Sequence, residues 1–273
     1  MSATWDGGAP PPAPRRGLGG ALRIALRAPA MLLVLTGGMI VLMGLRLLER
    51  PLCGLHRPLS PHVTVAVCRM VLRIIGLRVA RSGPRMVGPG AIVANHTTWL
   101  DIFVLNSLGP VYFVSKAEVA GWPGIGWLAR ATGTVFINRD RREAQAQTRV
   151  FQDRLIAGHR LLFFPEGTST DGMQVLPFKT TLFAAFLAAP LRDRLQVQAM
   201  SLRYHAPEGR DARFYGWWGD MDFGPSLLMV LAQGRQGRVS VVRHPTLRVA
   251  EMADRKSLAQ RLEQQVRDGH RSG

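Results

Sequence analysis

Cysteine and acidic residues are scarce in this 273-residue chain, and each scarcity narrows what the protein can be. The two cysteines, Cys53 and Cys68, form neither a disulfide framework nor a metal-binding spacing, so a reducing, cytoplasmic setting is expected for the globular part. Only 18 acidic residues accompany 35 basic ones, which gives a formal net charge of +17 and indicates an acidic partner. Nucleic acid, anionic lipid and an acidic carrier protein all have the required charge.

Lysine is also nearly absent, and arginine supplies 32 of the 35 basic residues. A compositional bias toward arginine therefore explains part of the charge without any partner. Nucleic acid is the least favoured of the three partners, because the aromatic residues do not interleave with a basic stripe in any recognisable reading motif.

Length and composition indicate one principal domain with an N-terminal appendage. A chain of 273 residues with 47% hydrophobic content can bury a full core. Residues 6–14 read Asp-Gly-Gly-Ala-Pro-Pro-Pro-Ala-Pro, which can form neither a helix nor a strand ladder. We therefore expect a disordered leader over residues 1–20, a membrane-associated helical segment over residues 21–76 and an α/β domain over residues 77–273.

An uncharged stretch from Ala28 to Leu45, with arginines on both sides, predicts a helix embedded in a membrane. As a helix it would be about 27 Å long, against a hydrocarbon core of about 30 Å, so both a spanning and a half-inserted form are possible. Pro29 and the pair Gly37 and Gly38 weaken the helix. A cleaved signal peptide is disfavoured because no small-residue cleavage pattern follows the apolar run.

A second apolar stripe recurs at helical spacing between residues 67 and 75, with Arg69 and Arg73 on the opposite side. Such a helix can lie on a lipid surface, where each arginine near anionic head groups contributes about 1 kcal/mol. The same stripe could instead pack on the domain. Its position beside the uncharged stretch favours the membrane. The stripe consists of Val67, Met70, Val71, Ile74 and Ile75.

From Leu77 onward, short apolar runs alternate with helical patterns. This alternation predicts a layered α/β domain whose largely parallel mixed sheet is flanked by helices. The expected strands are 77–81, 91–94, 111–115, 134–137, 161–164, 197–204 and 239–242. The expected helices are 99–108, 141–157, 180–187, 225–232 and 255–267.

Three polar clusters each follow one of the expected strands. The carboxyl ends of parallel strands meet at one edge of a sheet, and ligands bind at that edge. We therefore expect the three clusters to share a single cleft. The clusters are His96 with Asp101, Asn138 with Arg139, and Glu166 with Gly167 and Thr168.

The first cluster places His96 five residues before Asp101, at an expected strand-to-helix turn. Residues five apart do not share a helix face, so the two side chains can meet only because His96 precedes the helix. Asp101 could then accept the proton of one ring nitrogen and leave the other nitrogen as a general base, with no serine or cysteine nucleophile. The segment also fits a capping box, in which Asp101 would only bind backbone donors at the helix start.

The remaining candidates suit the binding of a polar head group. Arg139 lies beside an expected helix start and is a good anion ligand, although a solvated arginine is the simpler interpretation. Gly167 permits a positive φ and a close backbone approach. Glu166 could bind a substrate hydroxyl, hold Arg139 or pair with another arginine. Lys179 could reach the same edge or be a surface lysine.

In this order, the three clusters resemble the sequence blocks of the glycerolipid acyltransferase superfamily, to which bacterial 1-acyl-glycerol-3-phosphate acyltransferases belong. Residues 95–101, Asn-His-Thr-Thr-Trp-Leu-Asp, resemble its His-x4-Asp block, residues 133–139 its second block and residues 164–168 its third. The resemblance covers roughly residues 90–204. The fourth block usually has a proline after a valine, which residues 197–200 lack, so the resemblance does not define the wall on the acyl side.

Two further segments resemble a bacterial subgroup, the lyso-ornithine-lipid O-acyltransferases. In residues 178–183, Lys179 is not followed by the glycine that is frequent in phosphatidate-forming enzymes. Residues 215–221 are rich in tryptophan, as in that subgroup. Paired tryptophans also suit a membrane interface or an acyl-chain wall, and ordinary core packing is their commonest role.

The resemblance implies a membrane-bound O-acyltransferase. Such an enzyme moves a fatty acyl group from an acyl carrier protein or coenzyme A thioester to the hydroxyl of lyso-ornithine lipid, 1-acyl-sn-glycerol-3-phosphate or both. His96 would act as general base and Asp101 would orient it, with no covalent intermediate, metal or bound cofactor. The residues expected to bind the acceptor are Asn138, Arg139, Glu166, Gly167, Thr168 and Lys179.

The implied location is the bacterial inner membrane, with the catalytic domain facing the cytoplasm. An alternative function is that of a noncatalytic basic protein that binds lipid at a membrane surface. That alternative explains the charge and the N-terminal segment equally well. It gives no reason for three polar clusters at one edge of the sheet, so the enzyme is favoured.

Overall fold

The structure, a computed structural model, describes residues 5–11, 17–122, 124–137, 144–187 and 191–273. The strands are β1 (Arg78–Ser82), β2 (Gly90–Ala94), β3 (Tyr112–Lys116), β4 (Val135–Ile137), β5 (Arg160–Phe163), β6 (Gln196–His205), β7 (Arg238–Arg243) and β8 (Leu247–Arg248). The α-helices are α1 (Leu18–Cys53), α2 (Ser60–Ile75), α3 (Leu100–Ser107), α4 (Ile125–Thr132), α5 (Ala144–Ile156), α6 (Phe223–Ala232) and α7 (Arg255–Ser272). Three 3-10 helices, η1 (Ala117–Gly121), η3 (Thr180–Leu187) and η4 (Val249–Glu251), complete the described elements.

The strands form one sheet in the order β1-β7-β6-β2-β5-β3-β4, with β8 paired to β6. Neighbouring strands from β6 to β4 run parallel, whereas β7 runs antiparallel to β6 and parallel to β1. The expected largely parallel mixed sheet is therefore confirmed. This arrangement brings the carboxyl ends of β2, β4 and β5 to the same edge.

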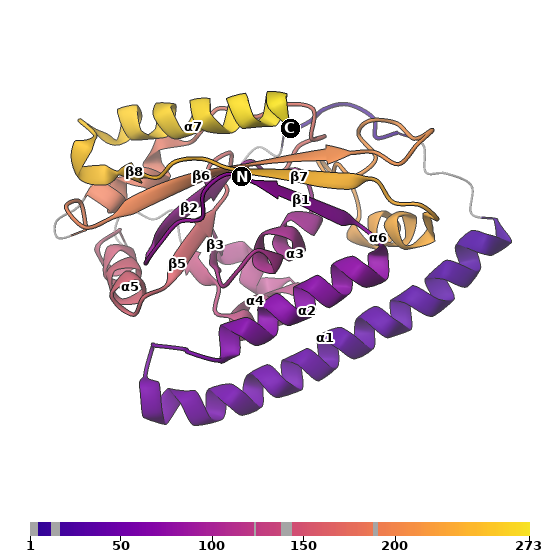
Figure 1. Cartoon of the computed structure of the whole chain (residues 1–273), viewed down its shortest axis with the longest axis horizontal. Helices are drawn as coiled ribbons and strands as arrows, with labels where there is room; N and C mark the ends of the chain where they lie inside the picture. Colours follow the sequence, from indigo (N-terminus) through magenta and orange to yellow (C-terminus); the bar gives the residue numbers. More distant parts are fainter. Residues whose placement is uncertain (1–4, 12–16, 123, 138–143, 188–190) are drawn as a thin grey trace.

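Strand β2 shows how the two apolar layers form on either side of the sheet. Successive side chains of a strand point to opposite faces. Ile92 and Ala94 join the core formed with α2, α3 and α6, whereas Ala91 and Val93 join the core formed with α5, η3 and α7. Figure 1 shows the resulting layers, with α7 on one side of the sheet and α1, α2 and α3 on the other.

Helix α1 runs for 36 residues, well beyond the expected stretch from Ala28 to Leu45, and continues through Pro29 and Pro51. Its inner side packs on the domain: Arg23 Nε donates to Ala232 O at 2.7 Å, and Arg27 Nη1 donates to Leu231 O at 2.9 Å. These carbonyls end α6, where cationic side chains are favourable. By length and composition, α1 is the one helix among the described residues that could cross a membrane.

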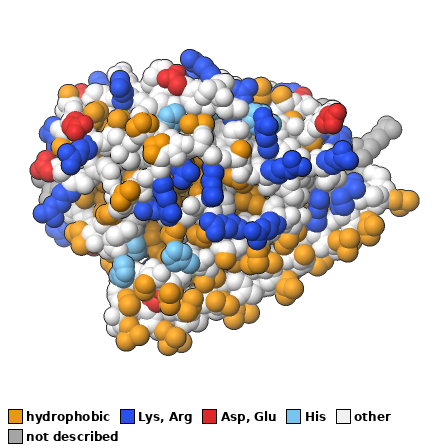
Figure 2. All heavy atoms as spheres, viewed as in Figure 1, with side chains coloured by type: hydrophobic (Ala, Val, Ile, Leu, Met, Phe, Trp, Pro, Cys, Tyr) orange, Lys and Arg blue, Asp and Glu red, His pale blue; other side chains and the backbone are white. Residues whose placement is uncertain are grey.

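The outer side of α1 is apolar and exposed along its whole length. Figure 2 shows hydrophobic side chains along the margin where α1 lies, with arginine and lysine side chains above them. The helix therefore has one side on the protein and one side free. The exposed apolar residues of α1 are Leu18, Leu22, Leu26, Leu32, Leu33, Ile40, Val41, Met43, Leu47, Leu48 and Leu52.

The second apolar stripe lies on α2 and packs on the domain, so the expectation that it faces lipid was wrong. Val71 and Ile75 are fully buried in the domain core, while Met70 is 40% exposed. Arg69 Nε donates to Ser107 O at 2.8 Å, at the end of α3, so this arginine binds the protein. The stripe packs on the domain because α1 and α3 lie on either side of α2.

Candidate active site

The loop between β2 and α3 carries the first polar cluster. Asn95, which follows β2 directly, is 1% exposed and joins this loop to β6. Its side chain donates to Leu202 O at 2.9 Å and accepts from Leu202 N at 2.7 Å. These two bonds hold the backbone that presents His96 at the carboxyl edge of the sheet.

His96 and Asp101 contact each other. His96 Nδ1 lies 2.7 Å from Asp101 Oδ2, and Asp101 lies in the first turn of α3. The Asp101 side chain is fully buried, whereas that of His96 is 19% exposed. Because Nδ1 faces the carboxylate, Nε2 is the ring nitrogen left for a substrate, and it has no hydrogen-bond partner among the residues that the structure describes.

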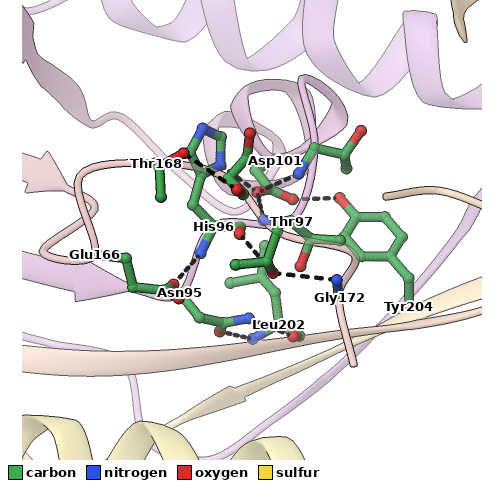
Figure 3. A network of polar contacts seen from close by, with 12 residues as sticks. Asn95, His96, Thr97, Asp101, Glu166, Thr168, Gly172, Leu202 and Tyr204 are labelled. Atoms are coloured by element: carbon green, nitrogen blue, oxygen red, sulfur yellow. Dashed lines mark hydrogen bonds and ion pairs between the residues drawn. The ribbon is translucent and has the colours of Figure 1, made fainter. Parts of the chain in front are cut away.

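Asp101 receives three more hydrogen bonds, which fix its carboxylate. Oδ2 accepts from Thr97 N at 2.7 Å and from Thr98 N at 3.1 Å, as in a helix cap. Oδ1 accepts from the Tyr204 hydroxyl at 2.7 Å. Figure 3 shows His96 and Tyr204 approaching Asp101 from two sides. The capping geometry and the contact with His96 are therefore present together, and neither excludes the other.

Two aromatic residues set the positions of these groups. The His96 ring stacks on Phe164 with 4.0 Å between centroids and 8° between planes. Tyr204 on β6 is buried, and burial raises the pKa of its hydroxyl well above the ordinary value, so it remains a donor to Asp101. Neither residue was predicted from the sequence.

Glu166 lies beneath the loop and connects the first and third clusters. Its Oε1 accepts from His96 N at 2.7 Å, and its Oε2 accepts from Leu176 N at 2.7 Å. The side chain is 1% exposed, and burial raises the pKa of its carboxyl to about 8. Glu166 therefore binds backbone amides of its own protein, and neither a substrate hydroxyl nor Arg139 is needed to explain its position.

The turn that follows Glu166 has the expected backbone geometry. Gly167 has a φ of 73°, in the left-handed region that glycine adopts without strain. A Cβ at Gly167 would lie 2.7 Å from Lys179 Nζ, so the exposed Lys179 ammonium lies close over this turn. Lys179 thus reaches the third cluster, as the sequence suggested it could.

Asn138 and Arg139, the candidates of the second cluster, lie outside the described residues. Strand β4 ends immediately before them at Ile137 and pairs parallel to β3. Because β3 is parallel to β5, β4 ends at the same edge of the sheet as β2 and β5. The structure thus brings the first and third clusters together and ends β4 on their side.

The N-terminal segment reaches the third cluster. Trp5 N donates to Thr168 Oγ1 at 3.4 Å, and the Trp5 ring packs edge-on against Trp218 with 6.1 Å between centroids. Trp218 Nε1 donates to Gly8 O at 3.1 Å. Residues 5–11 carry neither helix nor strand, yet they contact Thr168, a candidate site residue.

The tryptophan-rich segment supports the catalytic loop from the other side. Trp217 N donates to Thr97 O at 2.9 Å, directly beside His96. Tyr215 and Trp218 are 2% and 3% exposed, so core packing is their role in the structure. Among the described residues, no group of three or more His, Cys, Asp or Glu side chains is arranged to hold a metal ion.

Comparison with known proteins identifies a family and similar chains. The family model described as Acyltransferase matches residues 76–203. The chain is 56% identical over 265 residues to the lyso-ornithine lipid O-acyltransferase of Rhodobacter capsulatus, covering 97% of this chain and 96% of that protein. It is 33% identical over 195 residues to the 1-acyl-sn-glycerol-3-phosphate acyltransferase of Neisseria gonorrhoeae, covering 71% of this chain and 74% of that protein.

The fold is similar to that of a solved structure. The crystal structure of the 1-acyl-sn-glycerophosphate acyltransferase PlsC from Thermotoga maritima superposes with a TM-score of 0.66 at 18% identity. The match covers 94% of this chain and 98% of that chain, so it includes both the N-terminal helices and the α/β domain.

Proposed function

This chain belongs to the PlsC-like acyltransferase family, and from that premise we propose that it moves a fatty acyl group from a thioester to the hydroxyl of lyso-ornithine lipid. The proposed acceptor is that named for the Rhodobacter capsulatus relative, which is similar over nearly the full length of both chains. A second acceptor, 1-acyl-sn-glycerol-3-phosphate, is named for the relative from Neisseria gonorrhoeae. Acyl carrier protein and coenzyme A are the two proposed carriers of the thioester.

The contact between His96 and Asp101 carries the proposed mechanism. Nε2 of His96 takes the proton of the acceptor hydroxyl as its oxygen attacks the thioester carbonyl carbon. The new C–O bond forms, the C–S bond breaks, and the proton passes from the imidazolium to the leaving sulfur. Asp101 holds the Nδ1–H tautomer at 2.7 Å and stabilises the imidazolium. This sequence of steps needs neither a covalent acyl-enzyme nor a metal.

The backbone amides nearest His96 are considered first as donors to the oxyanion that forms from the thioester carbonyl. The amides of Thr97 and Thr98 lie near a helix start, a favourable place for such donors. Both already donate to Asp101 Oδ2, at 2.7 and 3.1 Å. We therefore assign them to the support of Asp101 and expect the oxyanion donors elsewhere at the carboxyl edge.

Head-group binding is assigned to the second and third clusters. Arg139 would bind the ornithine carboxylate of the acceptor, or the phosphate of the second acceptor, through paired N–H donors, with Asn138 beside it. The Lys179 ammonium, close over Gly167, would add a second positive charge near Thr168. Glu166 contributes by holding His96 N at 2.7 Å, which makes it a positioning residue in this proposal.

Helix α1 would attach the enzyme to the membrane. Its inner side contacts α6, α2 and α4, so the helix lies along the domain. A helix held in this way can insert its exposed apolar side into one leaflet without leaving the protein. We therefore favour the half-inserted form, at the bacterial inner membrane and with the domain on the cytoplasmic side.

A transfer assay with the full-length protein, purified in a nonionic detergent, tests the function. The protein is given a labelled acyl carrier protein thioester or the coenzyme A thioester, together with lyso-ornithine lipid or 1-acyl-sn-glycerol-3-phosphate. We expect labelled ornithine lipid to form, and His96→Ala to reduce its rate by about 10²- to 10⁴-fold because the general base is lost. The matched control is His62→Ala, which changes an exposed histidine on α2 and should retain the rate of acyl transfer.

Two outcomes would contradict the proposal. Near-normal turnover by a folded His96→Ala variant would remove His96 from the chemistry. If the thioester is consumed with neither of the two acceptors, lysolipid acylation is excluded as the function.

The Arg139→Ala variant should raise the KM for the acceptor more than the KM for the thioester. Arg142→Ala, from the same arginine run, is its control. An unchanged acceptor KM would remove Arg139 from head-group binding.

A further inference from the structure

Three arginines converge at the amino edge of the sheet, opposite the candidate active site. Arg46 lies in α1, Arg57 in the loop between α1 and α2, and Arg154 in α5. They surround Tyr112, the first residue of β3, and Gly133, which precedes β4. We refer to Arg46, Arg57 and Arg154 as the arginine cluster.

Contacts around Gly133 and Tyr112 show how close the three guanidinium groups are. A Cβ at Gly133 would lie 2.5 Å from Arg57 Nη1 and 3.0 Å from Arg46 Nη2. Arg154 Nη2 donates to Gly133 O at 3.3 Å. The Cζ atoms of Arg57 and Arg154 lie 5.7 and 5.4 Å from the centroid of the Tyr112 ring. The ring face offers a modest cation–π attraction but no negative charge.

Among the described residues, the cluster has no carboxylate bound to it. Glu49 acts on Arg46 through its charge, but its Oε1 accepts from Leu59 N at 2.6 Å and from Ser60 N at 3.0 Å. Arg46 Nε and Arg57 Nη1 are buried and have no hydrogen-bond partner within the described chain. Buried donors without partners are costly, and Glu49 acts on only one of the three converging cations, so the cluster indicates that a ligand completes it.

The electrostatics of the neighbouring groups agree with a missing anion. Burial, followed by repulsion from Arg57, lowers the pKa of Arg46 to about 10. Burial and then the charges of Arg154 and Arg57 lower the pKa of His159 to about 4, so this histidine is neutral at pH 7. Its Nδ1 lies 3.4 Å from Arg154 Nη1 and can accept from it. His159 therefore adds no positive charge to the arginine cluster at pH 7.

We propose that the arginine cluster binds a phosphate group, carried either by an anionic phospholipid or by free inorganic phosphate. Guanidinium groups bind phosphate oxygens through paired N–H donors, and three of them can neutralise a dianion. Each side chain of the cluster is partly exposed, so an anion can approach from solvent or from a bilayer surface.

The surroundings favour the phospholipid as the source. Close to Arg46 in the sequence, α1 has three highly exposed leucines: Leu47 (77% exposed), Leu48 (62%) and Leu52 (81%). A bilayer in contact with these leucines would place its phosphate layer next to Arg46 and Arg57. This choice of source rests on the membrane association proposed above. Binding of free phosphate does not depend on it.

The site is separate from the proposed head-group site. Tyr112 begins β3 and His159 precedes β5, whereas His96 and Glu166 follow the ends of β2 and β5. These strands are parallel, so the two sites lie at opposite edges of the sheet. The phosphate bound here would not be that of a reacting acceptor; it would fix how the protein sits on the membrane.

Thermal unfolding of the full-length protein in nonionic detergent tests the proposal. Sodium phosphate is titrated at constant ionic strength in one arm, and micelles doped with phosphatidylglycerol are compared with phosphatidylcholine in the other. Above its Kd, phosphate should raise the Tm by about 3 to 5 °C for each tenfold increase in concentration. Arg57→Gln and Arg46→Gln should abolish this rise. Arg50→Gln removes an exposed charge from the same end of α1 and should preserve it.

The Tm of each variant measured without ligand shows whether the arginine binds an anion or only stabilises the fold. Arg57→Gln removes like-charge repulsion, so its Tm without phosphate should equal or exceed that of the wild type. A response to both phosphate and phosphatidylglycerol, or to the lipid alone, supports the site and identifies its source. The proposal would be overturned if the Tm of wild type, Arg57→Gln and Arg50→Gln responded equally to the ligand, or if none of them responded. It would also be overturned if the Tm of Arg57→Gln without ligand were lower than that of the wild type. Acyl transfer by Arg57→Gln in detergent is measured separately and should continue, so this result is independent of the proposed chemistry.

Discussion

The two edges of the sheet differ in whether their buried charged groups have partners. At the carboxyl edge, the Asp101 carboxylate is fully buried and receives hydrogen bonds from His96, Thr97, Thr98 and Tyr204. At the amino edge, the arginine cluster has no bound carboxylate among the described residues and retains buried donors without partners.

This difference separates a site prepared for chemistry from one prepared for a ligand. A buried carboxylate with four donors is held in one geometry before the substrate arrives, which is what a general-base site requires. Three adjacent cations raise the energy of the folded protein until an anion joins them. If the comparison is correct, substitutions at the carboxyl edge will reduce catalysis, and substitutions at the amino edge will change stability and its response to anions and protons.

Asp101→Asn should have the largest effect. The asparagine oxygen should keep the place of Oδ2, because Thr97 N, Thr98 N and His96 Nδ1 all donate there, but the neutral amide has no negative charge to stabilise the imidazolium. We expect the rate of acyl transfer to fall by about 10²- to 10⁴-fold. The matched control is Asp254→Asn, because Asp254 caps α7 by accepting from Lys256 N and Ser257 N but contacts no histidine. Equal losses of activity in both variants would mean that Asp101 acts only as a helix cap.

Much of this carboxyl edge could be predicted from the sequence. The apolar runs predicted the seven longest strands to within one or two residues. The signal is clearest for β2, β5 and β6, because strands buried on both faces stand out against polar turns. The contact between His96 and Asp101 followed from the position of His96 before a helix. The positive φ at Gly167 followed from the need for a tight turn.

The remaining features depend on partners that are distant in the chain. Tyr204 lies 103 residues from Asp101, and Phe164 stacks on His96 from the end of β5. Nothing in their local sequence distinguishes them from core aromatics. The side chain of Glu166 binds two backbone amides, which have no sequence signature. Helix α4 escaped prediction because residues 121–126 are dense in glycine and proline.

The arginine cluster shows the same limitation on the other edge. Arg46 was recognised only as a flank of the uncharged stretch, and Arg57 and Arg154 as contributors to net charge. Their convergence follows from α1 continuing past Leu45 and then turning toward α2, which the uncharged stretch alone does not define. Sequence patterns give the period of a helix, but which side chains meet across helices depends on tertiary packing.

Tyr204→Phe should have the second largest effect. It leaves Asp101 Oδ1 buried without a donor, which we expect to reduce kcat by about tenfold and stability by about 1 to 3 kcal/mol. The KM values for thioester and acceptor should be unchanged, because Tyr204 contacts Asp101 and not the substrates. Tyr215→Phe is the matched control: its hydroxyl donates to Gln236 Oε1 at 2.7 Å and its ring packs 5.4 Å from that of Tyr204.

Stability and kcat together distinguish positioning from packing at Tyr204. Both tyrosine variants should unfold at lower denaturant concentrations, but only Tyr204→Phe should lose kcat. A parallel loss of kcat in Tyr215→Phe would mean that general loosening of this core, and not the bond to Asp101, limits the reaction.

The last prediction concerns stability alone, at His159, which lies beside the positive charge at the amino edge. Its pKa of about 4 in the folded protein lies below the ordinary 6.5, because of burial and the charges of Arg154 and Arg57, with a smaller contribution from His56. Between pH 6.5 and 4, the unfolded chain therefore binds a proton that the folded protein does not. The free energy of unfolding should decrease as the pH falls through this window, by up to about 1.4 kcal/mol per pH unit.

Denaturant unfolding of wild type and His159→Gln at pH 7, 6 and 5 measures this contribution as a difference. The difference is needed because Glu166, whose pKa is raised to about 8 by burial, changes stability in the opposite direction over much of this range. The exposed His62→Gln variant controls for the loss of a histidine. Phosphate bound at the arginine cluster would offset the charges of Arg57 and Arg154, so it should weaken the acid sensitivity that His159 confers. Acid sensitivity that is the same with and without phosphate would mean that burial alone, and not the unpaired arginines, keeps His159 neutral.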